Sequence, residues 1–226
     1  MDFNDAPPGE GREKHHIAAI KATQKAGVEH VYYTSLAFTS DSGAGVMRAH
    51  LRTEEFLRSL EGMKYKIIRE GLYNESWPLY LGYYYDLKGD DRKEILVAGD
   101  GPVSWTSIAD LGYATALVLA EALRRYEGKT FYLSSPTTKT LKDVSAIVSE
   151  IKGREIGLMI VSRAEYEKFY TEMGRDRASV EWWSSTYAAL GHDECHIEDG
   201  TLGDLFSVTG KEPKPIAETV NEMIGS

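Results

Sequence analysis

Two ionisable side chains with helical spacing could carry acid–base chemistry in this 226-residue chain. His50 and Glu54 are four residues apart, so a helix would place them on one face. An imidazole changes its charge near neutral pH, which suits a general acid or base. We therefore take His50 and Glu54 as the first candidates for catalytic residues.

Further candidates follow two short runs of β-forming residues. Ser35 stands near the end of the run at 30–36, and Tyr73 comes soon after the run at 65–69. Loops at the C-terminal ends of strands are where α/β proteins place their sites, so Ser35 and Tyr73 join the catalytic candidates. The substrate-binding candidates come from the same two segments and from the aromatic stretch that follows: Leu36, Asn74, Trp77, Tyr80 and Tyr84.

Other polar residues have simpler structural interpretations. Asp110 is expected to be a helix N-cap, and Thr140 and Ser162 are each followed three residues later by an acid, as in a capping box. The segment 192–196 contains His, Asp, Glu and Cys, but its spacing matches no strong zinc motif, so no metal is expected. Cys195 is the single cysteine, which excludes an internal disulfide and indicates a reducing compartment.

The elements that must position these residues alternate between helices and short strands, which favours a parallel sheet and an α/β fold. Strands are expected at 30–36, 65–69, 94–98, 130–133 and 157–161. Helices are expected at 12–26, 46–60, 110–126, 140–152, 162–173, 177–190 and 215–224. We divide the chain into a core at 1–152 and a small, mostly helical lobe at 153–226 that packs on it, with the ligand cleft between them.

Composition limits the classes of function. The 35 acidic residues outnumber the 26 basic ones, and a net charge of −9 repels phosphate backbones, so a nucleic-acid partner is not expected. The longest apolar run, around 114–122, is too short to span a bilayer, and the first 12 residues lack the apolar centre of a signal peptide. We therefore expect a cytoplasmic protein without a membrane partner.

Four segments, in this order, make the chain resemble the NmrA-like family of atypical short-chain dehydrogenases. They are 26–36 (AGVEHVYYTSL), 50–57 (HLRTEEFL), 65–75 (YKIIREGLYNE) and 107–133, which contains IADLG and GKTFYL. The resemblance implies a partial Rossmann-like sheet and NAD(P)H-dependent oxidoreductase ancestry. It further implies a small quinone or carbonyl substrate, with NADP(H) as the possible cofactor.

The chain departs from this family at the glycine-rich turn that holds a dinucleotide pyrophosphate. None of its paired glycines follows a strand with a third glycine at the required spacing: Gly9 with Gly11, Gly43 with Gly45, and Gly99 with Gly101. By comparison with the family, we expect the chain to start after the fourth strand, without about 80–100 residues of β–α units. The cofactor-binding residues are therefore unknown.

A second departure leaves the activity open. The resemblance implies a tyrosine and a lysine four residues apart on the helix after 30–36, but 47–51 reads Met-Arg-Ala-His-Leu. Two alternatives follow. The chain could be a cofactor-independent isomerase, cyclase or dehydratase that reuses the substrate cleft, or a non-catalytic regulator that binds a transcription factor.

The resemblance also bears on assembly. Without the family's first four strands, the run at 30–36 would form an edge of the sheet. An apolar strand edge tends to pair with another chain. We therefore expect a homodimer, or a rearranged sheet, that covers Val31 and Tyr33.

Overall fold

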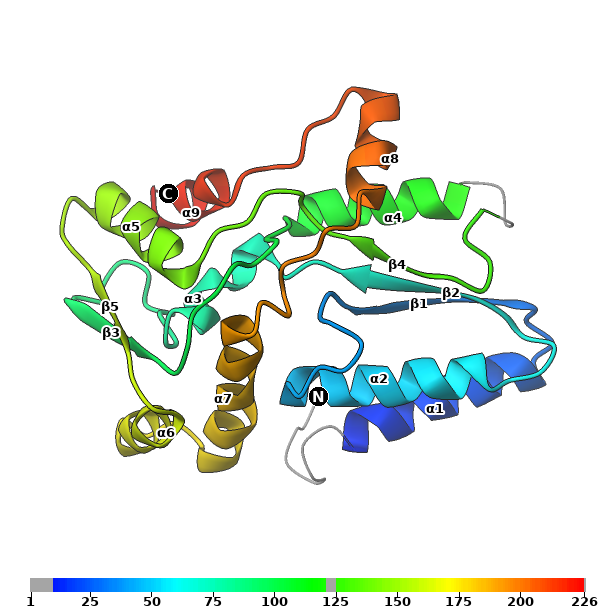
Figure 1. Ribbon diagram of the computed structural model, residues 1–226, viewed down its shortest axis with the longest axis horizontal. Coiled ribbons are helices and arrows are strands. Elements are labelled where there is room, and N and C mark those ends of the chain that lie inside the picture. Colours follow the sequence, from blue (N-terminus) through cyan, green and yellow to red (C-terminus); the bar gives the residue numbers. More distant parts are fainter. Residues whose placement is uncertain (1–9, 121–124, 226) are drawn as a thin grey trace.

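The computed structural model describes residues 10–120 and 125–225 and contains an α/β fold built around a three-stranded parallel sheet. The strands are β1 (His30–Leu36), β2 (Lys64–Glu70) and β4 (Thr130–Leu133), in the order β1-β2-β4. Figure 1 shows α1 and α2 on one face of this sheet and α4 and α8 on the other. The predicted α/β class with helices flanking a parallel sheet is confirmed.

Of the described helices, seven match the predicted ranges to within a few residues, whereas two helices and a 3-10 turn lie outside those ranges. In chain order, the elements are α1 (Glu10–Lys25), α2 (Gly45–Arg58), a 3-10 turn η1 (Asn74–Ser76), α3 (Trp77–Tyr80), α4 (Ile108–Ala120), α5 (Leu141–Lys152), α6 (Arg163–Glu172), α7 (Arg177–Gly191), α8 (Thr201–Thr209) and α9 (Ile216–Gly225). The predicted extension of α4 to residue 126 includes positions 121–124, which lie outside the described residues.

The two capping boxes are confirmed, but the predicted N-cap of α4 is wrong. The Thr140 and Ser162 hydroxyls each accept from the backbone N–H three residues on. At α4, the Ser107 hydroxyl accepts from the Asp110 N–H at 3.1 Å, because the helix begins two residues earlier than expected. The buried Asp110 carboxylate instead accepts from the Lys214 N–H at 2.7 Å and from the Lys211 ammonium group.

A second, smaller parallel sheet pairs β3 (Glu94–Val97) with β5 (Gly157–Ile160). One of its strands comes from residues 1–152 and the other from residues 153–226. The division at 152 therefore stays a prediction, and the small sheet joins the two sides of that boundary.

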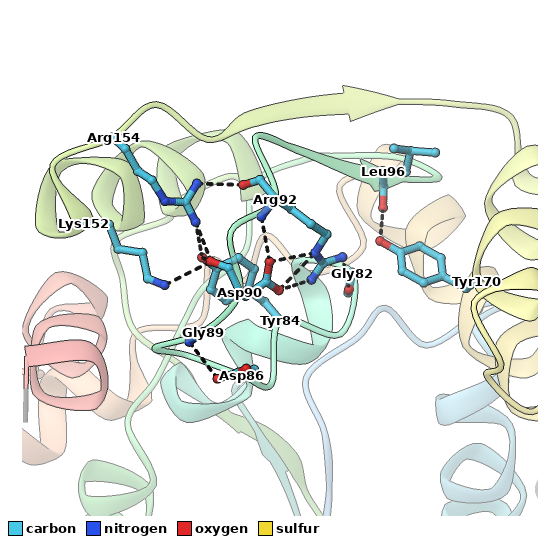
Figure 2. A network of polar contacts seen from close by, with 10 residues as sticks. All are labelled: Gly82, Tyr84, Asp86, Gly89, Asp90, Arg92, Leu96, Lys152, Arg154 and Tyr170. Atoms are coloured by element: carbon cyan, nitrogen blue, oxygen red, sulfur yellow. Dashed lines mark hydrogen bonds and ion pairs between the residues drawn. The ribbon is translucent and has the colours of Figure 1, made fainter.

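Polar contacts attach the loop after α3 to the small sheet and to α5 (Figure 2). The Arg154 guanidinium donates to the Arg92 carbonyl at 2.8 Å, and the Arg92 guanidinium pairs with the Asp90 carboxylate at 2.6 Å. The Tyr170 hydroxyl donates to the Leu96 carbonyl at 2.9 Å, which adds α6 to the same network. These bonds hold the loop at 82–92 in one position.

Alternation along β2 distributes its side chains between two hydrophobic clusters. Ile67 packs with Ile20 and Leu57 beneath α1 and α2, whereas Ile68 packs with Leu111 and Phe206 beneath α4 and α8. Successive side chains of a strand point to opposite faces of a sheet. The next two residues of β2 therefore also separate, one to each face. In the described part of the chain, no helix has the length and apolar character that crossing a membrane requires.

Candidate functional site

The parallel strands of the large sheet end together at one edge, and this edge is the candidate site. Leu36 of β1 is in register with Glu70 of β2, which in turn is in register with Leu133 of β4. Ligands of open α/β sheets bind outside the carboxyl ends of the strands. Of the predicted residues, Ser35, Leu36 and Tyr73 lie at this edge.

Ser35 and Glu54 do meet, but within a buried ion pair. The Ser35 hydroxyl donates to Glu54 Oε1 at 2.7 Å, and Arg69 donates from Nε to Oε1 at 3.0 Å and from Nη2 to Oε2 at 2.8 Å. Burial opposes the charged form, but the hydrogen bonds from Arg69 and Ser35 outweigh it and hold the pKa of Glu54 below its usual value. This arrangement favours an anchoring role for Glu54 over the predicted proton exchange.

Arg69 organises this face of the site, and sequence reasoning missed it. Its Nη1 donates to the Phe38 carbonyl at 3.0 Å, to Ser40 Oγ at 3.1 Å and to the Tyr132 hydroxyl at 2.7 Å. The guanidinium thereby connects α2, β4 and the loop after β1. An arginine directly after two strand isoleucines was the signal, because a charged side chain in a buried strand requires a partner.

His50 lies in a separate polar cluster, against the middle of β1. The Tyr33 hydroxyl lies 2.8 Å from His50 Nδ1 and 3.1 Å from His16 Nδ1, and His16 Nδ1 lies 3.0 Å from Thr53 Oγ1. Burial lowers the pKa of His50 to about 3, and nearby Arg12 and His16 act in the same direction. His50 is therefore neutral near pH 7, and its bond to Tyr33 ties α2 to β1.

Tyr73 follows β2 at the site edge, and its phenol contacts a carboxyl group that the sequence did not single out. Its hydroxyl donates to Glu70 Oε2 at 3.1 Å, and both side chains are partly buried. Burial raises the pKa of Glu70, and the hydrogen bond from Tyr73 offsets only part of that rise. Burial together with the charge of Glu70 raises the pKa of Tyr73 to about 12. The Tyr73 phenol and the Glu70 carboxyl group are thus joined by one hydrogen bond.

Asn74, a predicted substrate-binding residue, fixes the site loop to the C-terminal helix through its amide nitrogen. Its side chain is buried, and its Nδ2 donates to the Lys214 carbonyl at 3.2 Å and to Thr219 Oγ1 at 3.1 Å. Its backbone N–H donates to the Thr106 carbonyl at 3.0 Å. These bonds place the segment after Tyr73 firmly beneath α9.

The aromatic substrate-binding candidates pack in the hydrophobic core, and their contact with a substrate stays a prediction. Trp77 and Tyr84 are completely buried, and Tyr80 is 6% exposed. The Tyr80 ring packs edge-on against two tryptophans, Trp105 and Trp183. These rings belong to the core cluster that also contains residues of β3, α5, α6 and α7, where their apolar area is removed from water.

Two shallow surface grooves lie near these elements. One of about 370 Å³ runs past Glu75, Leu79 and Met223, and one of about 420 Å³ lies between the 87–91 loop and Arg154. Within the part of the chain that the structure describes, no three His, Cys, Asp or Glu side chains converge to hold a metal ion.

The helix N-termini that follow strands are occupied by the chain's own side chains. In α2, the Gly45 N–H donates to Ser185 Oγ at 2.8 Å. In α4, the Ile108 N–H donates to Glu75 Oε2 at 3.1 Å, and in α5 the Leu141 N–H donates to Asp100 Oδ1 at 2.7 Å. A dinucleotide pyrophosphate normally binds free amides at such a position. These three helix starts therefore do not fit that group.

Fold and site together place the protein among the Rossmann-like α/β proteins. No family model matches the sequence. A search of curated proteins finds an NmrA-like family domain-containing oxidoreductase of Aspergillus flavus, which is 30% identical over 218 residues that span 94% of this chain and 67% of that protein. The chain belongs to the NmrA-like family and shares its oxidoreductase ancestry.

Two further relatives support this placement. Quinone oxidoreductase 2 of Escherichia coli is 28% identical over 216 residues, which span 94% of this chain and 71% of that protein. The structure of the NADPH-dependent quinone oxidoreductase QOR2 of Escherichia coli, in complex with NADPH, matches with a TM-score of 0.79. Its sequence identity is 25%, and the match covers 96% of this chain and 74% of that one. A triphenylmethane reductase of Citrobacter sp. matches with a TM-score of 0.77 and 26% identity over 100% of this chain and 74% of that one.

Proposed function

We propose that this protein is an oxidoreductase that acts on a small quinone or carbonyl compound at the carboxyl edge of its large sheet. The observation that carries the proposal is the position of Tyr73, whose partly exposed phenol has Glu70 as its hydrogen-bond partner at that edge. The names of the relatives, a quinone oxidoreductase and a triphenylmethane reductase, support a small-molecule substrate.

In this proposal Tyr73 donates a proton to the substrate oxygen. Reduction of a quinone or carbonyl group places negative charge on that oxygen, and a phenol within hydrogen-bond reach neutralises it. Leu36 offers apolar surface at the end of β1, while Ser35 and Glu54 act through Arg69 to hold the loop after β1. Each side chain thus has a distinct part: proton donation, contact or support.

NADP(H) is the reductant that the family implies, and structures of relatives are described with NADPH or NADP(H). It would supply the reducing equivalents. The first amides of α2, α4 and α5 already donate to side chains of this chain. We therefore assign to the described residues the binding of substrate and the donation of a proton to it. A dinucleotide would require binding groups other than these amides.

Calorimetric titration with NADPH and NADH tests the cofactor part. We expect the folded chain to bind these dinucleotides more weakly than micromolar, because the amides at the starts of α2, α4 and α5 are occupied. Micromolar binding would show that a dinucleotide site exists elsewhere in the chain or across an assembly. Light scattering on the same sample would report the homodimer that we propose to form through β1.

Replacement of Tyr73 by Phe tests the proton donor. With menadione as the quinone and saturating NADPH, we expect Tyr73→Phe to lower kcat by about 100-fold, the usual contribution of a general acid. Tyr113→Phe is the matched control, because Tyr113 is 39% exposed on α4 and contacts Phe206. Unchanged kcat in Tyr73→Phe would remove Tyr73 from the reaction.

A cofactor-free acid–base reaction is the second candidate, and the occupied helix N-termini favour it. The same Tyr73–Glu70 pair could move a proton on and off a carbon next to a carbonyl group. Exchange of substrate protons for deuterium without NADPH would support this reading. No quinone reduction by a folded chain with NADPH would overturn the oxidoreductase proposal.

A further inference from the structure

Glu70 occupies an unusual position for a carboxyl group. It is the last residue of β2 and points to the face opposite Arg69, so it does not share that guanidinium. Its register neighbours on the two adjacent strands, Leu36 and Leu133, are apolar. The hydroxyl of Tyr73, at 3.1 Å, is its polar side-chain contact.

Three other buried or partly buried carboxylates of the described chain are matched by cations. Glu54 pairs with Arg69, Asp90 with Arg92, and Asp110 with Lys211, and the pKa of each carboxyl group is lowered. Glu70 forms no ion pair with any residue that the structure describes, and burial raises its pKa. An unpaired carboxyl in a partly apolar setting holds a proton more strongly than one in water.

We propose that Glu70 is a positioning residue that returns a proton to Tyr73 after Tyr73 has protonated the substrate. The inference rests on the proposed function. When substrate is bound, the Tyr73 hydroxyl turns from Glu70 Oε2 to donate to the substrate oxygen, and the protonated Glu70 carboxyl donates to the phenol oxygen in its place. The O–H bond of Tyr73 breaks as its proton moves to the substrate oxygen, and the Glu70 carboxylic acid then gives its proton to the phenolate. A proton from the solvent then restores the Glu70 carboxylic acid. The second transfer is downhill, because a carboxylic acid is a far stronger acid than a phenol.

The coupling has a defined pH direction. Tyr73 is the titratable group that affects the pKa of Glu70, and Glu70 in turn affects the pKa of Tyr73. The charge on Tyr73 also affects the pKa of Tyr80. The register partners of Glu70 on β1 and β4 are the uncharged Leu36 and Leu133. As the pH rises, Glu70 loses its proton, and its negative charge makes Tyr73 harder to ionise.

NMR titration of carbon-13 labels at Glu Cδ and Tyr Cζ measures this coupling without any need for turnover. In the native chain, Glu70 should titrate above the ordinary glutamate pKa of about 4.3. In Glu70→Gln, the Tyr73 titration should move down toward about 10, the value of a free tyrosine. In Tyr73→Phe, Glu70 should titrate higher still, because its carboxylate loses a donor. Glu61→Gln, at an exposed turn before β2, should leave Tyr73 unchanged.

Either of two results would overturn the inference: a Glu70 titration at or below about 4.3, or an unchanged Tyr73 titration in Glu70→Gln. The pH profile of menadione reduction separates this failure from that of the proposed function. Activity should fall as Glu70 ionises, and Glu70→Gln should remove that limb. If Tyr73→Phe lowers kcat but Glu70→Gln leaves the profile intact, only the role of Glu70 fails. If the titrations are coupled but Tyr73→Phe is fully active, the proposed function fails.

Discussion

Adjacent residues of β2 show how strongly a charged side chain depends on its partners. Arg69 turns toward α2 and keeps Glu54 ionised, whereas Glu70 turns toward Leu36 and Leu133 and meets a phenol. The two carboxyl groups are alike in the sequence, yet the pKa of Glu54 is lowered and that of Glu70 is raised. Neighbouring groups decide between these directions.

Two partly buried histidines, His16 and His50, make the stability of the fold depend on pH. The pKa of both His16 and His50 is lowered in the folded chain, mainly by burial, and that of His50 falls to about 3. The unfolded chain therefore binds protons more strongly once the pH falls below about 6.5. Stability is fully present above that pH and is lost progressively between about 6.5 and 3.

We expect each pH unit below 6.5 to cost about 1.4 kcal/mol for a histidine that stays neutral in the fold. Urea unfolding at several pH values between 5 and 8 measures the slope. His50→Gln should reduce it, and His192→Gln, at an exposed position, should not. Equal slopes in the native chain and His50→Gln would contradict the proposed burial cost.

At the element scale, one carboxylate joins the first turn of α4 to the segment before α9. Asp110 was expected to begin the helix, but Ser107 does so, which leaves the carboxylate for the Lys214 N–H and the Lys211 ammonium. The same C-terminal segment also receives Asn74 through the Lys214 carbonyl. The strand-end loop and α4 thus share one support.

Asp110→Ala should loosen this support. It leaves the Lys214 N–H without its acceptor, and an unsatisfied buried donor costs about 1–3 kcal/mol. Hydrogen exchange of the Lys214 amide should become faster, while Glu212→Ala, at an exposed position in the same segment, should leave it unchanged. Unchanged exchange in Asp110→Ala would show that other contacts hold the segment.

At the scale of the whole molecule, the outer side of β1 is an unpaired edge of the large sheet within the described residues. Within the described residues β1 pairs with β2, and its other side carries unpaired backbone groups. The Ala37 N–H bonds to the Glu70 carbonyl, so by alternation the Thr34 N–H points to the open edge. Such an edge is a template for pairing with a second copy.

Thr34→Pro tests the proposed homodimer. Thr34 is exposed, and proline removes its outward N–H without taking a bond from the ladder with β2. Light scattering should report the mass of two chains for the native protein and of one chain for the variant. A native chain that is monomeric at all concentrations would contradict the proposed homodimer. Ser59→Pro is not a suitable control, because the Ser59 N–H donates to the Glu55 carbonyl of α2.

Local patterns by themselves determined the elements. The runs at 30–36 and 130–133 that were expected to be strands are strands with those bounds, and Thr140 and Ser162 precede helices as capping residues. These outcomes rest on interactions between residues a few positions apart, which a sequence displays directly. The same holds for the four segments that placed the chain in its family.

Tertiary structure alone decided which candidates share a site. Two of the contacts join separate elements: Glu54 of α2 pairs with Arg69 of β2, and His50 of α2 contacts Tyr33 of β1. The third contact, between Tyr73 and Glu70, depends on the face of the sheet to which the end of β2 points. A residue type predicts a capacity for chemistry, but solvent exposure and the nearest charge set whether that capacity is available. Those two quantities arise only when the strands align and the helices cover them.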